Sequence, residues 1–123
     1  MVFWRRHKDG TGAGQGMGRG PSSMSRDDLA HLESFASTRQ GVEIYVEPAT
    51  TVTPTTVALV ARDGEWTRRR VEGPSDAAAL GRRLGIPVYD VAAVGYPDRM
   101  RQWTRAKREA EKLRLRGTDP APS

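Results

Sequence analysis

A run of five consecutive apolar residues, followed closely by a turn signal, constrains the fold more than any other feature of the sequence. Residues 57–61 read VALVA, and a strand that is apolar at every position is typical of the centre of a sheet covered on both faces. Asp63-Gly64 is the preferred pair for a two-residue type I′ hairpin turn. Pairing outward from that turn sets Leu59 opposite Arg68. The sequence therefore predicts a central strand joined by a tight hairpin to an arginine-rich strand.

The arginine-rich strand has polar side chains on both of its faces. Arg68, Arg69 and Arg70 are consecutive, so they alternate between the two faces, which suits the edge of a sheet. Trp66 shares a face with Arg68 and Arg70. Two interpretations of this shared face remain open. It is either a stacking platform for nucleic-acid bases or, as we favour, a core tryptophan covered by arginine stems.

Two further segments are predicted to be extended. Residues 42–47 alternate strictly, with Val42, Ile44 and Val46 on one face, which indicates a half-buried strand. Residues 86–91 read IPVYDV, and the proline near their start favours the edge of a sheet. The chain therefore contains three to four candidate strands.

Two helices are predicted between these strands. Ser25 is a good N-cap for the first, with Asp28 as its capping-box partner, and Gly41 is placed to end it. The second begins with Ser75 as its cap and ends at Gly85. Their apolar stripes are Leu29, Leu32, Phe35 and Ala36 in the first helix, and Ala77, Leu80 and Leu84 in the second.

These elements indicate an α/β fold of the α+β type: a small sheet of three to four strands with a hairpin, packed by two to three helices. A chain of 123 residues has room for one modest core, so we expect residues 25–116 to form a single domain. Residues 1–24 have glycine at alternate positions from 10 to 20 and predict a flexible basic tail. Residues 117–123 are predicted to form a second, disordered tail. The absence of cysteine excludes disulfides and cysteine nucleophiles.

The net charge of +5 is distributed unevenly along the chain. Residues 1–24 carry +3 and residues 97–123 carry +4, whereas residues 25–96 carry −2. The basic character therefore belongs to the two ends. Such ends either attract nucleic acid, anionic lipid or acidic protein surfaces, or simply keep a small protein in solution.

A long helix is predicted over residues 98–116, and its faces differ. One face, about 140° wide, is apolar and can dock on the domain. It consists of Met100, Trp103, Ala106, Ala110 and Leu113. Another face, about 80° wide, carries five cations that we call the basic ridge. The basic ridge consists of Arg101, Arg105, Arg108, Lys112 and Arg116. Like charges at this spacing repel, so we expect an external anion on the ridge; an ordinary solvated face is the alternative.

We predict that nucleic acid binds the basic ridge, together with Arg68 and Arg70 of the predicted edge strand. Phosphate contacts of this kind add salt-sensitive affinity without reading base sequence. The expected partner is RNA, DNA or a nucleoprotein such as the ribosome. The alternative is a protein-interaction adaptor, or a homodimer, that uses Met100, Trp103 and Leu113 as its contact surface.

A third interpretation is an enzyme. The plausible acid–base groups are Tyr45, Tyr89, Tyr96, His31, Asp90 and Glu43. Their spacing builds neither a nucleophile–base pair nor a paired-carboxylate site. The alternating glycines also lack the spacing of a dinucleotide-binding fingerprint. We therefore expect no catalytic residue, no metal and no cofactor.

Nothing in the sequence suggests a membrane protein. No apolar run approaches the roughly 20 residues needed to cross a bilayer, and the opening residues MVFWRR lack the hydrophobic stretch of a secretory signal. We expect a cytoplasmic location and no stable membrane insertion.

Several short motifs carry a resemblance to a known group of proteins. They are Val46-Glu47-Pro48, residues 63–70 (DGEWTRRR), residues 85–90 (GIPVYD) and residues 95–100 (GYPDRM). Over roughly residues 30–105 the chain resembles a family of short, uncharacterised actinobacterial proteins. The resemblance implies an actinobacterial source and the extent of the domain. Some members carry an oxidoreductase label, which makes a small oxidoreductase of unknown substrate the third alternative function. No redox cysteine or dinucleotide fingerprint supports that activity here.

Overall fold

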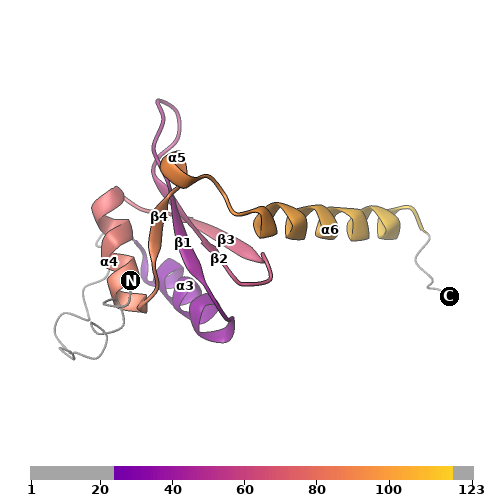
Figure 1. The fold of residues 1–123 in the computed structure, drawn as a ribbon, viewed down its shortest axis with the longest axis horizontal. Coiled ribbons are helices and arrows are strands. Elements are labelled where there is room, and N and C mark those ends of the chain that lie inside the picture. The colour runs from indigo at the N-terminus through magenta and orange to yellow at the C-terminus, as the bar shows by residue number, and fades with distance from the viewer. Residues whose placement is uncertain (1–23, 118–123) are drawn as a thin grey trace.

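The computed structural model describes residues 24–117, which form an α+β fold with one mixed sheet (Figure 1). The predicted flexible tails lie outside the described residues, apart from Met24 and Gly117. In chain order the elements are α3 (Arg26–Thr38), β1 (Glu43–Glu47), β2 (Thr56–Val60), β3 (Trp66–Arg70), α4 (Pro74–Leu84), β4 (Val88–Asp90), α5 (Val91–Val94) and α6 (Asp98–Leu115).

The four strands are arranged in the order β3-β2-β1-β4. β1 pairs antiparallel with β2 and parallel with β4, and β2 pairs antiparallel with β3. The α+β prediction is therefore confirmed. Strand β2, which contains most of the apolar run 57–61, is interior. The arginine-rich strand β3 and strand β4, which follows Pro87, lie at the two edges.

The predicted register of the hairpin is wrong by one residue. Val60 pairs with Trp66, and Ala58 rather than Leu59 lies opposite Arg68. The Ala61 N–H donates to the Glu65 carbonyl, so residues 62–64 form a three-residue loop. Gly64 has φ +99° in this loop, a conformation that favours glycine, as in a hairpin closed by a glycine bulge. The slip moves Arg68 to the opposite face of β2 from the predicted one.

The helix ends differ in detail from the predictions. The Ser25 hydroxyl accepts from the Asp28 N–H, which confirms this N-cap. The Asp28 carboxylate, however, pairs with Arg69 rather than completing a capping box. α3 ends at Thr38, three residues before Gly41. The N-cap of α4 is Gly73 rather than Ser75, and Gly85 ends α4 in the left-handed conformation as predicted. The short helix α5 was not predicted.

One face of the sheet is covered by α3 and α4. Leu32 and Phe35 of α3, together with Leu80 of α4, pack on the inward side chains of β1 and β2. The complete buried cluster is Leu32, Phe35, Val42, Ile44, Val46, Val57, Leu59, Ala61, Val71, Ala77 and Leu80. This face holds the larger core, since it buries eleven side chains, all of them apolar, against four on the opposite face.

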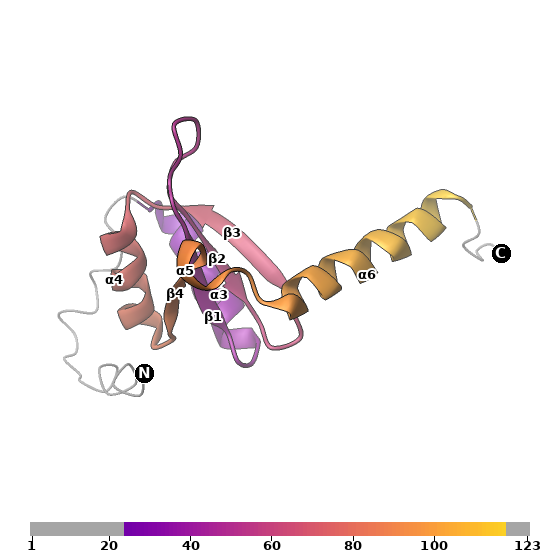
Figure 2. The same ribbon diagram turned by 45° about the horizontal axis from the view of Figure 1, so that its top comes forward.

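The opposite face of the sheet carries a smaller cluster and the start of α6. Tyr45, Ala58, Val60 and Met100 are buried there, with Trp66 and other aromatic side chains packed around them. Beyond its first turns α6 extends away from the rest of the described domain, as both views show (Figures 1 and 2). Among the described residues, no helix combines the length and apolar character needed to span a membrane.

Candidate functional site

The first two turns of α6, which we call its root (residues 98–104), are held on the β2–β3 hairpin. Arg99 donates from Nε to the Ala61 carbonyl (2.9 Å) and from Nη2 to Glu43 Oε1 (2.7 Å). The indole Nε1 of Trp66 donates to Thr104 Oγ1 at 2.8 Å. These bonds join the end of β2, strand β1 and strand β3 to one helix, so the root has a defined position on the sheet.

Gly64 allows the root to approach the hairpin loop. A Cβ at this position would lie 2.0 Å from the Arg99 carbonyl oxygen and 2.9 Å from Trp103 Cβ. Only a residue without a side chain fits there. The glycine therefore serves two purposes: it adopts the positive φ of the loop, and it makes room for α6.

The remainder of α6, which we call its outer part (residues 105–115), does not dock on the domain. The apolar face predicted to dock is used only at its start: Met100 is 7% exposed, and Trp103 is half-buried. Ala106 and Ala110 are exposed, and Leu113 is 52% exposed. The docking prediction is therefore wrong for the outer part, where two alanines and one leucine offer too little apolar area to hold the helix on the sheet.

The cations of the basic ridge are left largely without acidic partners. Arg101 pairs with Asp98, and both side chains are mostly exposed, so the pair contributes little. Within residues 24–117 the other four cations of the ridge make no ion pair. The neighbouring Lys107 instead lies over the Trp103 ring at 5.2 Å. The ridge therefore presents its charge to solvent.

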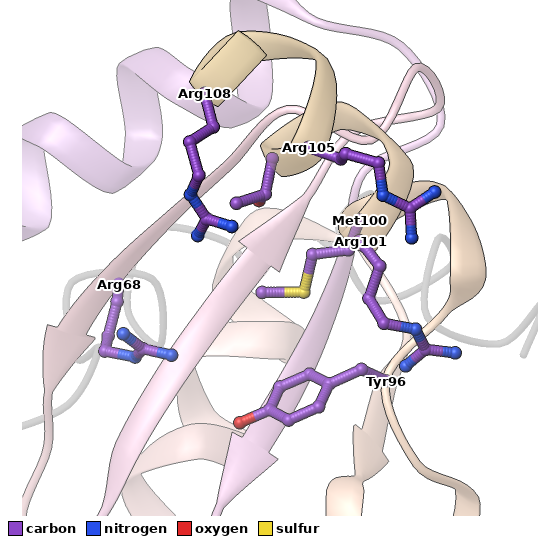
Figure 3. Close-up of a pocket in the computed structure, with 7 residues that line it drawn as sticks. Arg68, Tyr96, Met100, Arg101, Arg105 and Arg108 are labelled. Carbon is purple, nitrogen blue, oxygen red and sulfur yellow. The ribbon is translucent and has the colours of Figure 1, made fainter. Parts of the chain in front are cut away.

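A cavity of about 390 Å³ lies where the ridge meets strand β3. Its described lining consists of Arg68, Tyr96, Met100, Arg101, Thr104, Arg105 and Arg108, none of which is acidic (Figure 3). Figure 3 shows Arg108 extending from α6 toward β3, on the same side of Met100 as Arg68, while Arg101 and Arg105 extend on the other side. Four arginines from two elements thus surround one hollow with an apolar floor.

Arg68 is held in place by a network of polar groups. Its Nε and Nη2 donate to the two carboxylate oxygens of Glu47, each at 2.8 Å. Its guanidinium lies 4.9 Å from the centre of the Trp66 ring, which matches the favoured interpretation of a packed tryptophan under an arginine. The Glu47 carboxylate also accepts from the Tyr96 and Thr56 hydroxyls. Burial by itself would raise the pKa of Glu47, but the hydrogen bonds from Arg68, Thr56 and Tyr96 lower it below its ordinary value.

The other cations singled out from the sequence do not line this cavity. Arg70 lies on the face of Arg68, but near the far end of β3 it lines a separate hollow with Pro54, Val71 and Glu72. Arg69 points to the covered face and pairs with Asp28 of α3. Lys112, near the end of α6, and Arg116, its C-cap, are exposed and continue the ridge beyond the cavity.

The candidate acid–base groups are spread over both faces of the sheet. Tyr45 donates to Glu43 at 2.8 Å; burial, reinforced by that carboxylate, raises the pKa of Tyr45 to about 12. A tyrosine with so high a pKa is a poor base near neutral pH. His31 of α3 shares a hydrogen bond with Thr67 of β3. Burial and the nearby positive charge of Arg69 lower the pKa of His31. Asp90 caps α5 by accepting from the Ala92 N–H. Tyr45, Tyr89, Tyr96 and Glu43 therefore lie on the face of the sheet where α6 begins, with the Tyr45 and Tyr89 ring centroids 5.4 Å apart, whereas His31 lies on the face covered by α3.

The described residues also hold no group of three or more histidine, aspartate or glutamate side chains arranged to bind a metal ion. No protein-family model, curated protein or solved structure matches this chain. The function is therefore inferred from the geometry of the ridge and the cavity.

Sequence reasoning missed three residues that build the cavity. Glu47 orients Arg68, Thr104 receives the Trp66 indole, and Gly64 admits the root of α6. A signal for the first was present, because strict alternation places Glu47 on the face of Tyr45, opposite the apolar stripe of β1. The other two depend on where α6 docks, which no local pattern shows.

Proposed function

We propose that this chain is a binding module that presents the basic ridge of α6 to nucleic acid or to a nucleoprotein. One observation carries the proposal: the ridge lies on a helix that extends from the domain, and four of its five cations make no ion pair within the described residues. Free cations at regular spacing on a projecting helix favour contact with a regularly spaced polyanion. Each neutralised phosphate releases counterions, and this release supplies affinity.

The cavity strengthens the proposal because it places a hydrogen-bond donor of the sheet, Arg68, beside the arginines of α6. Arg68 comes from β3 and is held by Glu47 and Trp66, so its position does not depend on α6 alone. An arginine already fixed in place loses less conformational entropy on binding a phosphate than a free side chain does.

The proposal is tested by reversing charge on the ridge. Fluorescence anisotropy with labelled RNA and DNA would be measured over a range of salt concentrations for the triple variant Arg105→Glu, Arg108→Glu, Lys112→Glu. With single-stranded probes, losing three phosphate contacts is expected to reduce the slope of log affinity against log salt by about 2 and to weaken binding by more than about tenfold.

A matched control separates the ridge from total charge. The triple variant Arg26→Glu, Arg62→Glu, Arg114→Glu changes the net charge equally, but its residues lie outside the ridge and are exposed. This control should keep the wild-type salt slope. Equal losses in the two triple variants would show attraction by net charge alone and would overturn the proposal.

A second candidate function is self-association or binding of a protein partner through the outer part of α6. It rests on the exposure of Leu113 and Leu115, at 52% and 86%. Two of the three predicted contact residues do not favour it, because Met100 is buried and Trp103 packs beside Gly64. Light scattering distinguishes the candidates, since an apolar association survives high salt and phosphate binding does not.

A further inference from the structure

The cavity between β3 and the first half of α6 has a composition that the ridge alone does not explain. A surface that contacts only phosphate groups needs nothing but cations. This cavity is also lined by the Tyr96 ring and the buried Met100 side chain (Figure 3). We propose that it holds one unpaired nucleotide of a bound single strand, an inference that rests on the proposed function and specifies its ligand.

The hydrogen-bonding groups of the cavity suit a phosphate. Arg68 uses Nε and Nη2 on Glu47, which leaves Nη1 as a donor held in a fixed direction. The Thr104 hydroxyl oxygen accepts from the Trp66 indole, so its own hydrogen is available to donate into the cavity that it lines. Arg108 approaches from α6 on the side of Arg68. These donors line one cavity whose seven described lining residues include no acidic residue, so an anion enters without repulsion from a lining carboxylate.

The size and the apolar floor suit the rest of a nucleotide. A volume of about 390 Å³ lies at the lower end of the range for small-molecule sites and is far larger than a phosphate requires. The Tyr96 hydroxyl donates to Glu47, which fixes the ring at the side of the cavity. A flat base can lie against this ring and the Met100 thioether, because aromatic stacking accepts every base.

The base must be unpaired to enter. In a duplex each base is stacked and its edge is engaged by its partner, so it would first have to be flipped out of the helix. Charge alone favours the opposite choice, because a duplex has the higher charge density. The sign of the preference between single strand and duplex therefore separates a nucleotide site from a simple basic surface.

The experiment compares probes and variants of the full chain. Anisotropy would be measured with a labelled single strand of about 15 nucleotides and with the matching duplex, as both RNA and DNA. We expect the wild-type protein to bind the single strand about tenfold more tightly than the duplex. Thr104→Phe fills the cavity and keeps every cation, so it should remove this preference by weakening single-strand binding more than duplex binding. Ala110→Phe adds the same ring on the exposed outer part of α6 and should leave the preference intact.

A measurement on the wild-type protein guards against a folding defect in the cavity variant. A nucleoside 5′-monophosphate should displace the single strand at a concentration about tenfold lower than inorganic phosphate does, since only the nucleotide uses the apolar floor. Equal displacement by the two, or equal affinity for single strand and duplex, would overturn the nucleotide site. If the triple ridge variant still lost binding in that case, the proposed function would stand without it. Absence of binding to every probe would overturn both.

Discussion

The two faces of the sheet are built on different principles. Under α3 and α4, all eleven clustered side chains are apolar and buried. On the opposite face, ion pairs and hydroxyl groups surround a buried cluster of four residues, and the root of α6 is fastened to them. Folding stability therefore depends mainly on the first face, while the second positions a cationic helix. Substitutions on the two faces should therefore change different properties.

The largest effect on stability is expected from the covered face. Leu80 is fully buried between α4 and the sheet, so Leu80→Ala should lower the free energy of unfolding by about 2–5 kcal/mol through lost burial and a residual cavity. Urea denaturation followed by circular dichroism measures the change. Leu115→Ala, at a position 86% exposed, is the control and should be near neutral. Nucleic-acid affinity of the folded fraction should remain at the wild-type value, and a loss of affinity would show that the faces are not separable.

The next largest effect should come from the junction of α6 with the sheet. In Gly64→Ala the new Cβ would meet the Arg99 carbonyl oxygen at 2.0 Å with φ at +99°, so the strain should cost about 1–3 kcal/mol or displace the root of α6. Unfolding experiments measure the cost, and NMR shifts of the Trp103 indole report displacement. Gly73→Ala is the control, because nothing lies within 4 Å of its Cβ position. Equal stability of the two variants would contradict the close approach.

Much of the fold could be predicted because it follows from local patterns. The apolar run of β2, the Ser25 cap and the Gly85 stop are each specified by a few neighbouring residues. The hairpin register could not be predicted from neighbouring residues in this way. Asp63-Gly64 is compatible both with a two-residue loop and with a longer loop that ends in a glycine of positive φ. The choice between them is coupled to the packing of Gly64 against Arg99, 35 residues further along the chain.

The candidate site was only half predictable for a related reason. The spacing of the basic ridge follows from helical geometry and needs no tertiary information. The cavity exists because α6 leaves the sheet after Thr104, and this point of departure depends on contacts from Arg99 to Glu43 and from Trp66 to Thr104. A periodic apolar face indicates that a helix can dock. It does not indicate how many of its turns find a surface to dock on.

A smaller effect, dependent on pH, is expected within the polar network. Glu47→Gln removes the carboxylate that holds Arg68; since Arg68 is 44% exposed, the loss at neutral pH should be only about 1 kcal/mol. The pKa of Glu47 is lowered in the folded protein. Its contribution is therefore complete above the ordinary carboxyl pKa and is lost as the pH falls through the lowered value.

The measurement is urea denaturation of wild-type protein and the Glu47→Gln variant from pH 7 down to pH 3. Their stabilities should differ most at pH 7 and converge in acid. Glu111→Gln on the exposed part of α6 serves as the comparison and should follow the wild-type curve. A constant difference between wild type and the Glu47→Gln variant across this range would show that the ionised carboxylate does not stabilise the fold through Arg68.

The smallest effect on global stability is expected in the outer part of α6, which most sharply tests the contrast between docked and projecting structure. Ala110→Gly lowers helix propensity by about 0.8–1.0 kcal/mol. Residue 110 is exposed and lies within α6, which projects from the domain (Figure 2). This loss should therefore act locally and leave the free energy of global unfolding within about 0.5 kcal/mol of wild type. Hydrogen exchange of the amides in residues 106–115 should accelerate by about fivefold, while exchange in β2 stays unchanged.

Slower exchange in residues 106–115 after addition of single-stranded nucleic acid would place the partner on the ridge. Acceleration that spread to β2 would show that the outer helix unfolds together with the domain, which its exposed position does not predict.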